Sequence, residues 1–188
     1  MKKFLNPFVY FSGGTTLCVG IVIMAAMVLT AGLTGQTFRG ILSYGIGNYP
    51  YWRLALHLLG GWAIFSLLLY AVARAFSPSK VRFIDIAGNQ ALAKLPGLLM
   101  LVCDALFIEQ VMDEVNRIMD TQGQNLQITP SPSLLFVGIV GITVIIWFFA
   151  WSWKGFSIAA NMRGRRAIGL YIVCYIIAEA LSGFVCQI

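Results

Sequence analysis

The chain has very little charge. Of its 188 residues only 11% are Asp, Glu, Lys or Arg, while 59% are hydrophobic. Soluble domains have about 25% charged residues, so this composition excludes an ordinary water-soluble domain. Acidic residues are especially scarce, with seven Asp and Glu against thirteen Lys and Arg, and there is one histidine.

The sequence also lacks the short patterns that carry common chemistry. It has no HExxH, no GxSxG, no Walker A loop and no paired Asp box of the kind found in phospholipid synthases. None of the four cysteines forms a CxxC pair, and one histidine with scattered carboxylates is a poor metal-ligand set. We therefore expect no enzyme activity, no cofactor and no metal site.

What the chain does have is five long apolar stretches. A helix needs about 20 mostly apolar residues to cross a hydrocarbon core of roughly 30 Å, and five such spans use most of the chain. We expect an all-α integral membrane protein, a five-transmembrane-helix bundle formed by a single membrane domain over residues 1–188. The predicted spans cover residues 15–34, 54–76, 95–112, 133–153 and 167–186. Asp104 and Glu109 interrupt the third.

Two further segments are predicted to be short helices at the membrane surface. In residues 1–14, Phe4, Phe8 and Phe11 repeat at helical spacing and give one apolar face. A cleaved signal peptide is the alternative for this segment together with the first span, ending at the small residues around 31–35. The four later spans and the long aromatic stretch before the apolar core argue against it. In residues 83–92 the apolar side chains also follow helical spacing, which predicts a second interfacial helix.

The basic residues predict the orientation. Cytoplasmic loops of membrane proteins are enriched in Lys and Arg. With the N-terminus in the cytoplasm, that side holds Lys2, Lys3, Arg74, Lys80, Arg82, Lys94, Lys154, Arg163, Arg165 and Arg166, and the other side holds Arg39, Arg53 and Arg117. Ten against three predicts a cytoplasmic N-terminus and a C-terminus outside.

Three segments suggest a family. They are NPFxYF at 6–11, FIDIAGNQALAKLP at 83–96 and WKGFSIAANMRGRRA at 153–167. Together they resemble the bacterial branch of the Yip domain family, whose eukaryotic members are Ypt/Rab-interacting membrane proteins. The resemblance implies a five-helix protein of the bacterial cytoplasmic (inner) membrane. The eukaryotic members act in vesicle trafficking and bind small GTPases and one another, but this chain lacks their long soluble N-terminal region.

Glu179 is the most conspicuous polar residue in a span. It lies about 12 residues from the inner end of span five, roughly 18 Å deep. A carboxylate at such depth costs a few kcal/mol and is a functional candidate by default. Tyr175 lies one turn earlier on the same face. We consider two readings, a proton or cation site and a hydrogen-bonded structural carboxylate.

Three other residues are candidates for intramembrane chemistry. Asp104 lies near the middle of span three, and Glu109 lies about 140° away around the same helix, so the two cannot form one site directly. His57 lies near the outer end of span two. It either pairs with a carboxylate, which would let it titrate near neutral pH, or it lies at the interface near the helix start.

The basic loops are the other candidate site. Its residues are Lys80, Arg82, Lys94, Arg163, Arg165 and Arg166. They form either a surface for anionic lipid headgroups or a protein partner, or solvated charges that only set topology; we expect no nucleic-acid binding. The leading functional hypothesis is a membrane scaffold or interaction protein that acts through cytoplasmic loops and is able to form homo-oligomers. The alternative is a small transporter or channel component that uses the intramembrane carboxylates.

Overall fold

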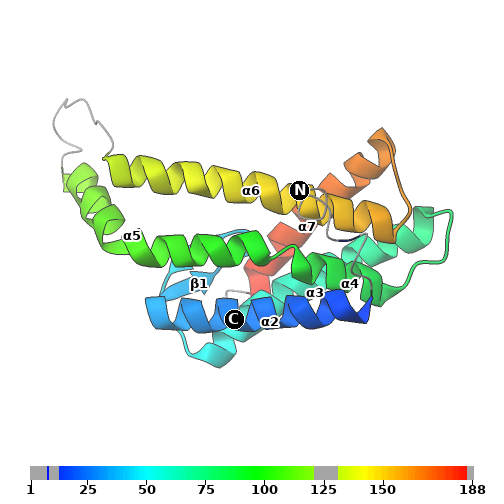
Figure 1. Ribbon diagram of the computed structural model, residues 1–188, viewed down its shortest axis with the longest axis horizontal. Coiled ribbons are helices and arrows are strands. Elements are labelled where there is room, and N and C mark those ends of the chain that lie inside the picture. Colours follow the sequence, from blue (N-terminus) through cyan, green and yellow to red (C-terminus); the bar gives the residue numbers. More distant parts are fainter. Residues whose placement is uncertain (1–7, 9–12, 121–130, 186–188) are drawn as a thin grey trace.

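The computed structural model describes residues 8, 13–120 and 131–185, and most of the predicted N-terminal surface helix lies outside this part (Figure 1). Long helices run side by side, with one small hairpin among them. The elements are α2 (Gly14–Thr34), β1 (Gln36–Phe38), β2 (Tyr44–Ile46), α3 (Tyr51–Phe76), α4 (Phe83–Leu92), α5 (Leu95–Asp120), α6 (Pro132–Ala159) and α7 (Arg165–Val185).

Five segments within the described residues are long and apolar enough to cross a membrane. They are Gly14–Thr34, Tyr51–Phe76, Phe83–Phe107, Pro132–Ala159 and Arg165–Phe184. Their outward faces are strongly apolar: on α6, Ile139, Ile142 and Ile146 are each at least 63% exposed. Such a surface suits hydrocarbon and not water. The prediction of an all-α protein with five spans is confirmed in part: the chain is mainly helical, with five segments long and apolar enough to cross a membrane, but it also contains a small β-hairpin that was not predicted.

Span three differs from its prediction. A helix does form over Phe83–Leu92, but Ile86 to Leu92 are all buried, so α4 is a packed part of the bundle. The prediction that this segment lies at the membrane surface is therefore wrong. The apolar segment begins at Phe83, continues through a short break at Ala93 and Lys94, and reaches Phe107 on α5. The polar side chains of Asn89 and Gln90 face the neighbouring helix α6.

The closest helix contact is between α2 and α4, and it depends on small residues. A Cβ added at Gly20 would lie 2.7 Å from the carbonyl carbon of Ala91. A Cβ added at Gly88 would lie 2.9 Å from the backbone nitrogen of Leu17. Because each glycine faces the backbone of the other helix, the two helices approach as closely as small residues allow in membranes.

Buried side-chain hydrogen bonds join α4 to α6 and α7. Gln90 donates to the backbone oxygen of Ser152 at 3.1 Å and accepts from its hydroxyl group. Tyr171 on α7 donates to the Ser152 hydroxyl at 2.7 Å, and Asn89 donates to the Gly155 carbonyl at 2.9 Å. Because buried polar groups must find partners, these bonds fix the relative rotation of the three helices.

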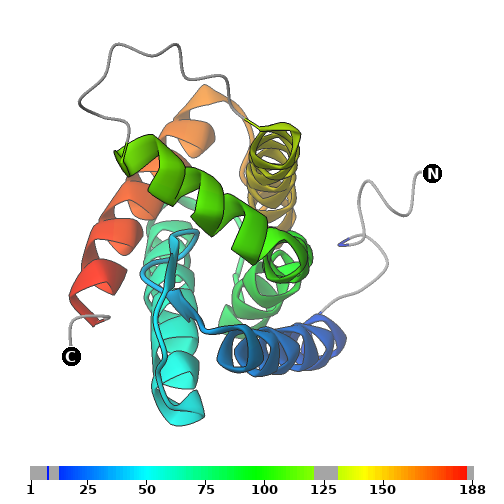
Figure 2. The same ribbon diagram turned by 90° about the vertical axis from the view of Figure 1, so that its left-hand side faces the viewer.

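The segment after α2 folds back into the bundle as an antiparallel hairpin. Gln36, Thr37 and Phe38 pair with Ile46, Gly45 and Tyr44. All three residues of β1 are buried, and Figure 2 shows the hairpin between α2, α3 and α5. Non-helical backbone is tolerated at membrane depth only where protein or water covers it. The helices cover β1, whereas β2 is only half-buried and Ile46 is exposed.

Candidate functional site

Two oppositely charged side chains hold the tip of the hairpin from opposite sides. Lys94 donates to the carbonyl oxygen of Ile41 at 2.7 Å, and the Glu179 carboxylate accepts from the Ile41 backbone N–H at 2.9 Å. Ser43 also donates to Glu179 at 2.6 Å. The two charges bind the two adjoining peptide groups of Ile41 and interact electrostatically with each other. At the turn the strands cannot pair all their own backbone groups, and Lys94 and Glu179 supply the missing partners.

Local sequence explains why Lys94 reaches this position. It lies at the break between α4 and α5, and Pro96 follows at the second position of α5, where a proline is compatible with a helix start. Lys94 is only 3% exposed. Its assignment to an exposed basic surface is therefore wrong: the side chain points into the bundle, and the phenyl ring of Phe148 lies 5.7 Å from its ammonium group.

Glu179 reaches the hairpin only because position 40 is glycine. A Cβ at Gly40 would lie 2.9 Å from the Glu179 carboxyl carbon and closer still to one of its oxygens. One turn earlier on α7, the ring of Tyr175 packs between Phe65 and Phe149 at centroid distances of 6.0 and 4.8 Å. Of the two readings of Glu179, this geometry favours the hydrogen-bonded structural carboxylate.

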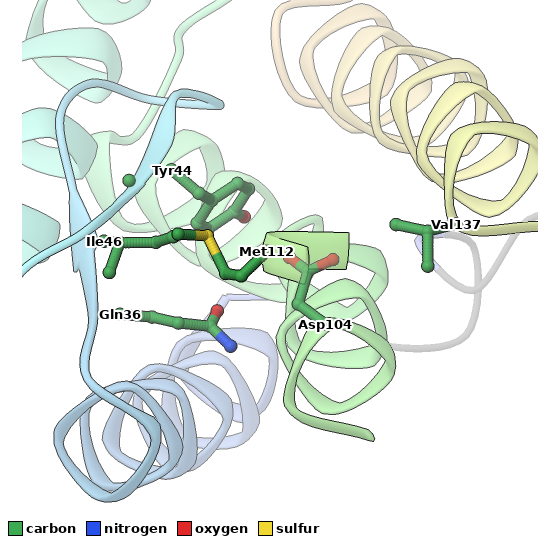
Figure 3. Close-up of a pocket in the computed structure, with 7 residues that line it drawn as sticks. Gln36, Tyr44, Ile46, Asp104, Met112 and Val137 are labelled. Atoms are coloured by element: carbon green, nitrogen blue, oxygen red, sulfur yellow. The ribbon is translucent and has the colours of Figure 1, made fainter. Parts of the chain in front are cut away.

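Asp104 lies in a different setting, at a pocket of about 180 Å³ between the hairpin, α5 and α6 (Figure 3). Gln36, Tyr44 and Met112 line the same pocket, and Val137 faces them from α6. Gln36 donates to the carbonyl of Leu101, but its side-chain oxygen and the Tyr44 hydroxyl are buried with no hydrogen-bond partner among the described residues. The pocket thus collects a carboxylate and two unpaired polar atoms.

Tyr44 connects the two carboxylates electrostatically. Burial raises the pKa of its hydroxyl group, and the negative charges of Asp104 and Glu179 raise that pKa further. The hydroxyl therefore stays protonated at neutral pH and remains a hydrogen-bond donor beside Asp104. The hairpin brings together two spans whose carboxylates the sequence could only treat separately.

The remaining intramembrane candidates lie apart from the hairpin tip, which Lys94 and Glu179 hold, and from the Asp104 pocket. Glu109 is exposed on α5, between Asp104 and Met112, and is not among the residues that line the Asp104 pocket. His57 is buried at a second pocket, beside Arg39 and Arg53, and no carboxylate lines that pocket in the described part of the chain. In these residues no group of three or more His, Cys, Asp and Glu side chains is arranged to hold a metal ion.

The basic loop residues gather at one end of the molecule. The α3–α4 and α6–α7 loops lie together on the right of Figure 1 and are joined by a 2.6 Å hydrogen bond from Ser77 to the Ala160 carbonyl. The exposed basic residues here are Arg74, Lys80, Arg82, Arg163, Arg165 and Arg166. Arg163 and Arg166 border a surface pocket of about 250 Å³, and the Arg166 guanidinium lies 5.1 Å from the Phe76 ring centroid.

The sequence did not reveal the hairpin or the role of Lys94 in holding it. One signal was present: glycines at 35, 40, 45 and 47 among aromatic residues are unusual for a simple connecting loop.

Comparison of the chain with family models, with curated proteins and with solved structures found no match. The resemblance to the Yip domain family therefore stays a prediction from the three sequence segments.

Proposed function

We propose that this chain is a non-enzymatic membrane scaffold whose basic end binds anionic phospholipid headgroups. The observation that carries the proposal is the gathering of six exposed Lys and Arg residues on two joined loops and on the helix ends beside them. Each basic residue near an anionic membrane surface contributes about 1 kcal/mol of attraction. Acidic residues are nearly absent from this end, because five of the seven lie along α5, one is Glu179, and the last is Asp85.

The proposal includes the orientation of the chain in the membrane and its location in the cell. The basic loops lie in the cytoplasm with the N-terminus, and the C-terminus lies outside, in the bacterial cytoplasmic membrane as a bacterial Yip-type protein. Without the buried Lys94, nine of the remaining twelve Lys and Arg residues still belong to the cytoplasmic side in this orientation. Scaffolding also fits the tightly bonded hairpin centre, because a rigid bundle holds its loops in fixed positions for lipids, protein partners or a second copy.

Charge reversal at the basic end tests this function. We expect Arg163→Glu, Arg165→Glu and Arg166→Glu together to remove most of the anionic phospholipid that co-purifies with the protein, because three attractive charges become repulsive. The measurement is phosphatidylglycerol retained per mole of purified protein. The three corresponding Gln substitutions should give an intermediate value. Unchanged lipid in the reversed variant, with topology preserved by cysteine labelling, would contradict the proposal.

A transporter or channel component is the second candidate, and one observation favours it. Asp104 borders a pocket within the span segment Phe83–Phe107, together with the unpaired oxygen of Gln36 and the unpaired hydroxyl of Tyr44. Three oxygen atoms of this kind could receive a proton or a small cation. Glu179 is a weaker candidate for that role, because its oxygens accept hydrogen bonds from the hairpin.

Ion flux separates the two functions. In proteoliposomes the scaffold function predicts no proton or sodium flux above that of empty vesicles. A transporter working through this pocket predicts flux that Asp104→Asn removes and that Glu109→Gln, a matched change at an exposed carboxylate of the same helix, leaves intact. Flux equal in wild type and both variants would exclude Asp104 as the site.

A further inference from the structure

The pocket beside His57 lies at the opposite end of the molecule from the basic loops and has a different chemical character. Its volume is about 470 Å³, and it is bordered by the hairpin, the first turns of α3 and the last turns of α7. The residues that matter here are Arg39, Tyr49, Arg53, His57 and Gly183. None of the described residues that line it is acidic.

The two arginines carry positive charge that the described part of the protein does not neutralise. The Arg53 guanidinium stacks over the Tyr49 ring at 4.8 Å, and its Nε is buried without a hydrogen-bond acceptor. Arg39 reaches the pocket from the hairpin. Arg53 is half-buried and Arg39 is exposed, but the buried Nε of Arg53 is a donor whose missing acceptor is costly. Arg53 also lies in the first turn of α3, where the helix dipole is positive. The site therefore favours an anion.

His57 supplies an independent observation. Its side chain is 2% exposed, and neither ring nitrogen forms a hydrogen bond of good geometry among the described residues, although the imidazole interacts electrostatically with the backbone of Phe38. Its ring instead lies edge-on to Tyr49, with centroids 6.1 Å apart. Leaving such a buried donor unpaired costs about 1–3 kcal/mol. Since the imidazole lines the pocket, a bound group with acceptor oxygens would satisfy it.

We propose that this pocket binds a phosphate group carried by a ligand, on the face of the cytoplasmic membrane that is opposite the basic loops. A phosphomonoester presents three strong acceptor oxygens, which matches two guanidinium groups and one imidazole better than the two oxygens of a carboxylate. Arginine binds phosphate with two parallel hydrogen bonds. The exposed Tyr49, Tyr51 and Trp52 lie at the same end, as aromatic residues do at headgroup depth. The phosphate comes either from a lipid headgroup or from solution.

Gly183 allows the pocket to be closed without removing a charge. A Cβ at this position would meet no atom within 4 Å, so the side chain of Gly183→Leu has room to extend into the cavity. Gly169→Leu is the matched control: it is the same change on the same helix, a Cβ there also meets nothing within 4 Å, and position 169 does not line the pocket. Arg39→Gln and Arg53→Gln remove the charges one at a time.

The experiment is calorimetric titration of the full-length protein in neutral detergent. Every protein tested, the wild-type pocket included, carries Arg163→Gln, Arg165→Gln and Arg166→Gln, so that the basic end does not take up the anionic probes. The probes are dioctanoyl phosphatidic acid, inorganic phosphate and dioctanoylglycerol. We expect wild type and Gly169→Leu to bind phosphatidic acid with the same Kd, Gly183→Leu to lose binding, and each Arg→Gln change to raise the Kd about tenfold. Binding of phosphatidic acid alone identifies a lipid source, and equal binding of inorganic phosphate identifies a soluble one.

Several results would overturn the assignment. They are no binding of either phosphate probe by wild type, equal binding of the uncharged dioctanoylglycerol, and Gly183→Leu binding as tightly as wild type. If Gly183→Leu loses its folded elution profile, the two Arg→Gln variants decide, and an unchanged Kd in both rejects the site. Because Arg163, Arg165 and Arg166 are neutral in every protein tested, the result is independent of the basic end.

Discussion

Lys94→Met should lower the free energy of unfolding by about 1–3 kcal/mol, the range for leaving a buried hydrogen-bonding group without its partner. Glu179 would then stay in the bundle without a compensating charge, and the Ile41 carbonyl would lose its hydrogen-bond donor. Glu179→Leu should cost a similar amount, because it leaves Lys94 uncompensated and removes the acceptor for both Ile41 and Ser43. The measurement is SDS-driven unfolding in mixed micelles.

Matched changes on the surface show whether burial is the cause. Lys80→Met and Glu109→Leu remove the same charges from exposed positions, and each should change the unfolding free energy by less than about 0.5 kcal/mol. The double variant Lys94→Met with Glu179→Leu should cost less than the sum of the two single changes, since no unpaired charge remains. Strict additivity would mean that the two side chains hold the hairpin independently.

The general architecture could be read from the sequence because the bilayer sets simple requirements. An apolar segment of about 20 residues must be a helix where lipid surrounds it, and the observed segments Gly14–Thr34 and Pro132–Ala159 satisfy this directly. Hydropathy could not place 83–94 correctly. Asn89, Gln90 and Lys94 look like a water-facing set, but they face Gly155, Ser152 and Ile41. Periodicity identifies a polar face and does not tell whether water or protein covers it.

The contacts of Lys94 and Glu179 with the hairpin could be predicted only in part, because the sequence does not show which distant residues meet. The cost of a carboxylate in a membrane singles out Glu179 without any structure. Its contacts with Ile41 and Ser43, and the opposing contact of Lys94, join residues that are 138, 136 and 53 positions apart. Each strand of the hairpin has three residues, too few for an alternating pattern to appear. The hairpin forms because helices enclose it, and a single sequence does not display that enclosure.

The small-residue contact between α2 and α4 leads to the second large effect. Gly20→Ala should destabilise the protein by about 3 kcal/mol, the upper end for overpacking, because its new methyl group would lie within 2.9 Å of the Leu92 nitrogen and nearer to Ala91. The obstacle is backbone, so the helices must separate. Gly88→Ala should act similarly through the backbone of Leu17. The same SDS unfolding measurement reports both changes.

Helix propensity alone predicts that a Gly→Ala change stabilises the helix, which is the opposite of the effect we expect from packing. Alanine favours a helix over glycine by about 0.8–1.0 kcal/mol, and Gly14→Ala, on the same helix where a Cβ meets nothing within 4 Å, should be neutral or stabilising. Destabilisation at position 20 but not at 14 would therefore be due to packing. Once one methyl group has separated the helices, the second finds more space, so Gly20→Ala with Gly88→Ala should cost less than the two single changes added together. If Gly20→Ala is as stable as Gly14→Ala, α2 and α4 are not in backbone contact, and the buried position of α4 loses its main support.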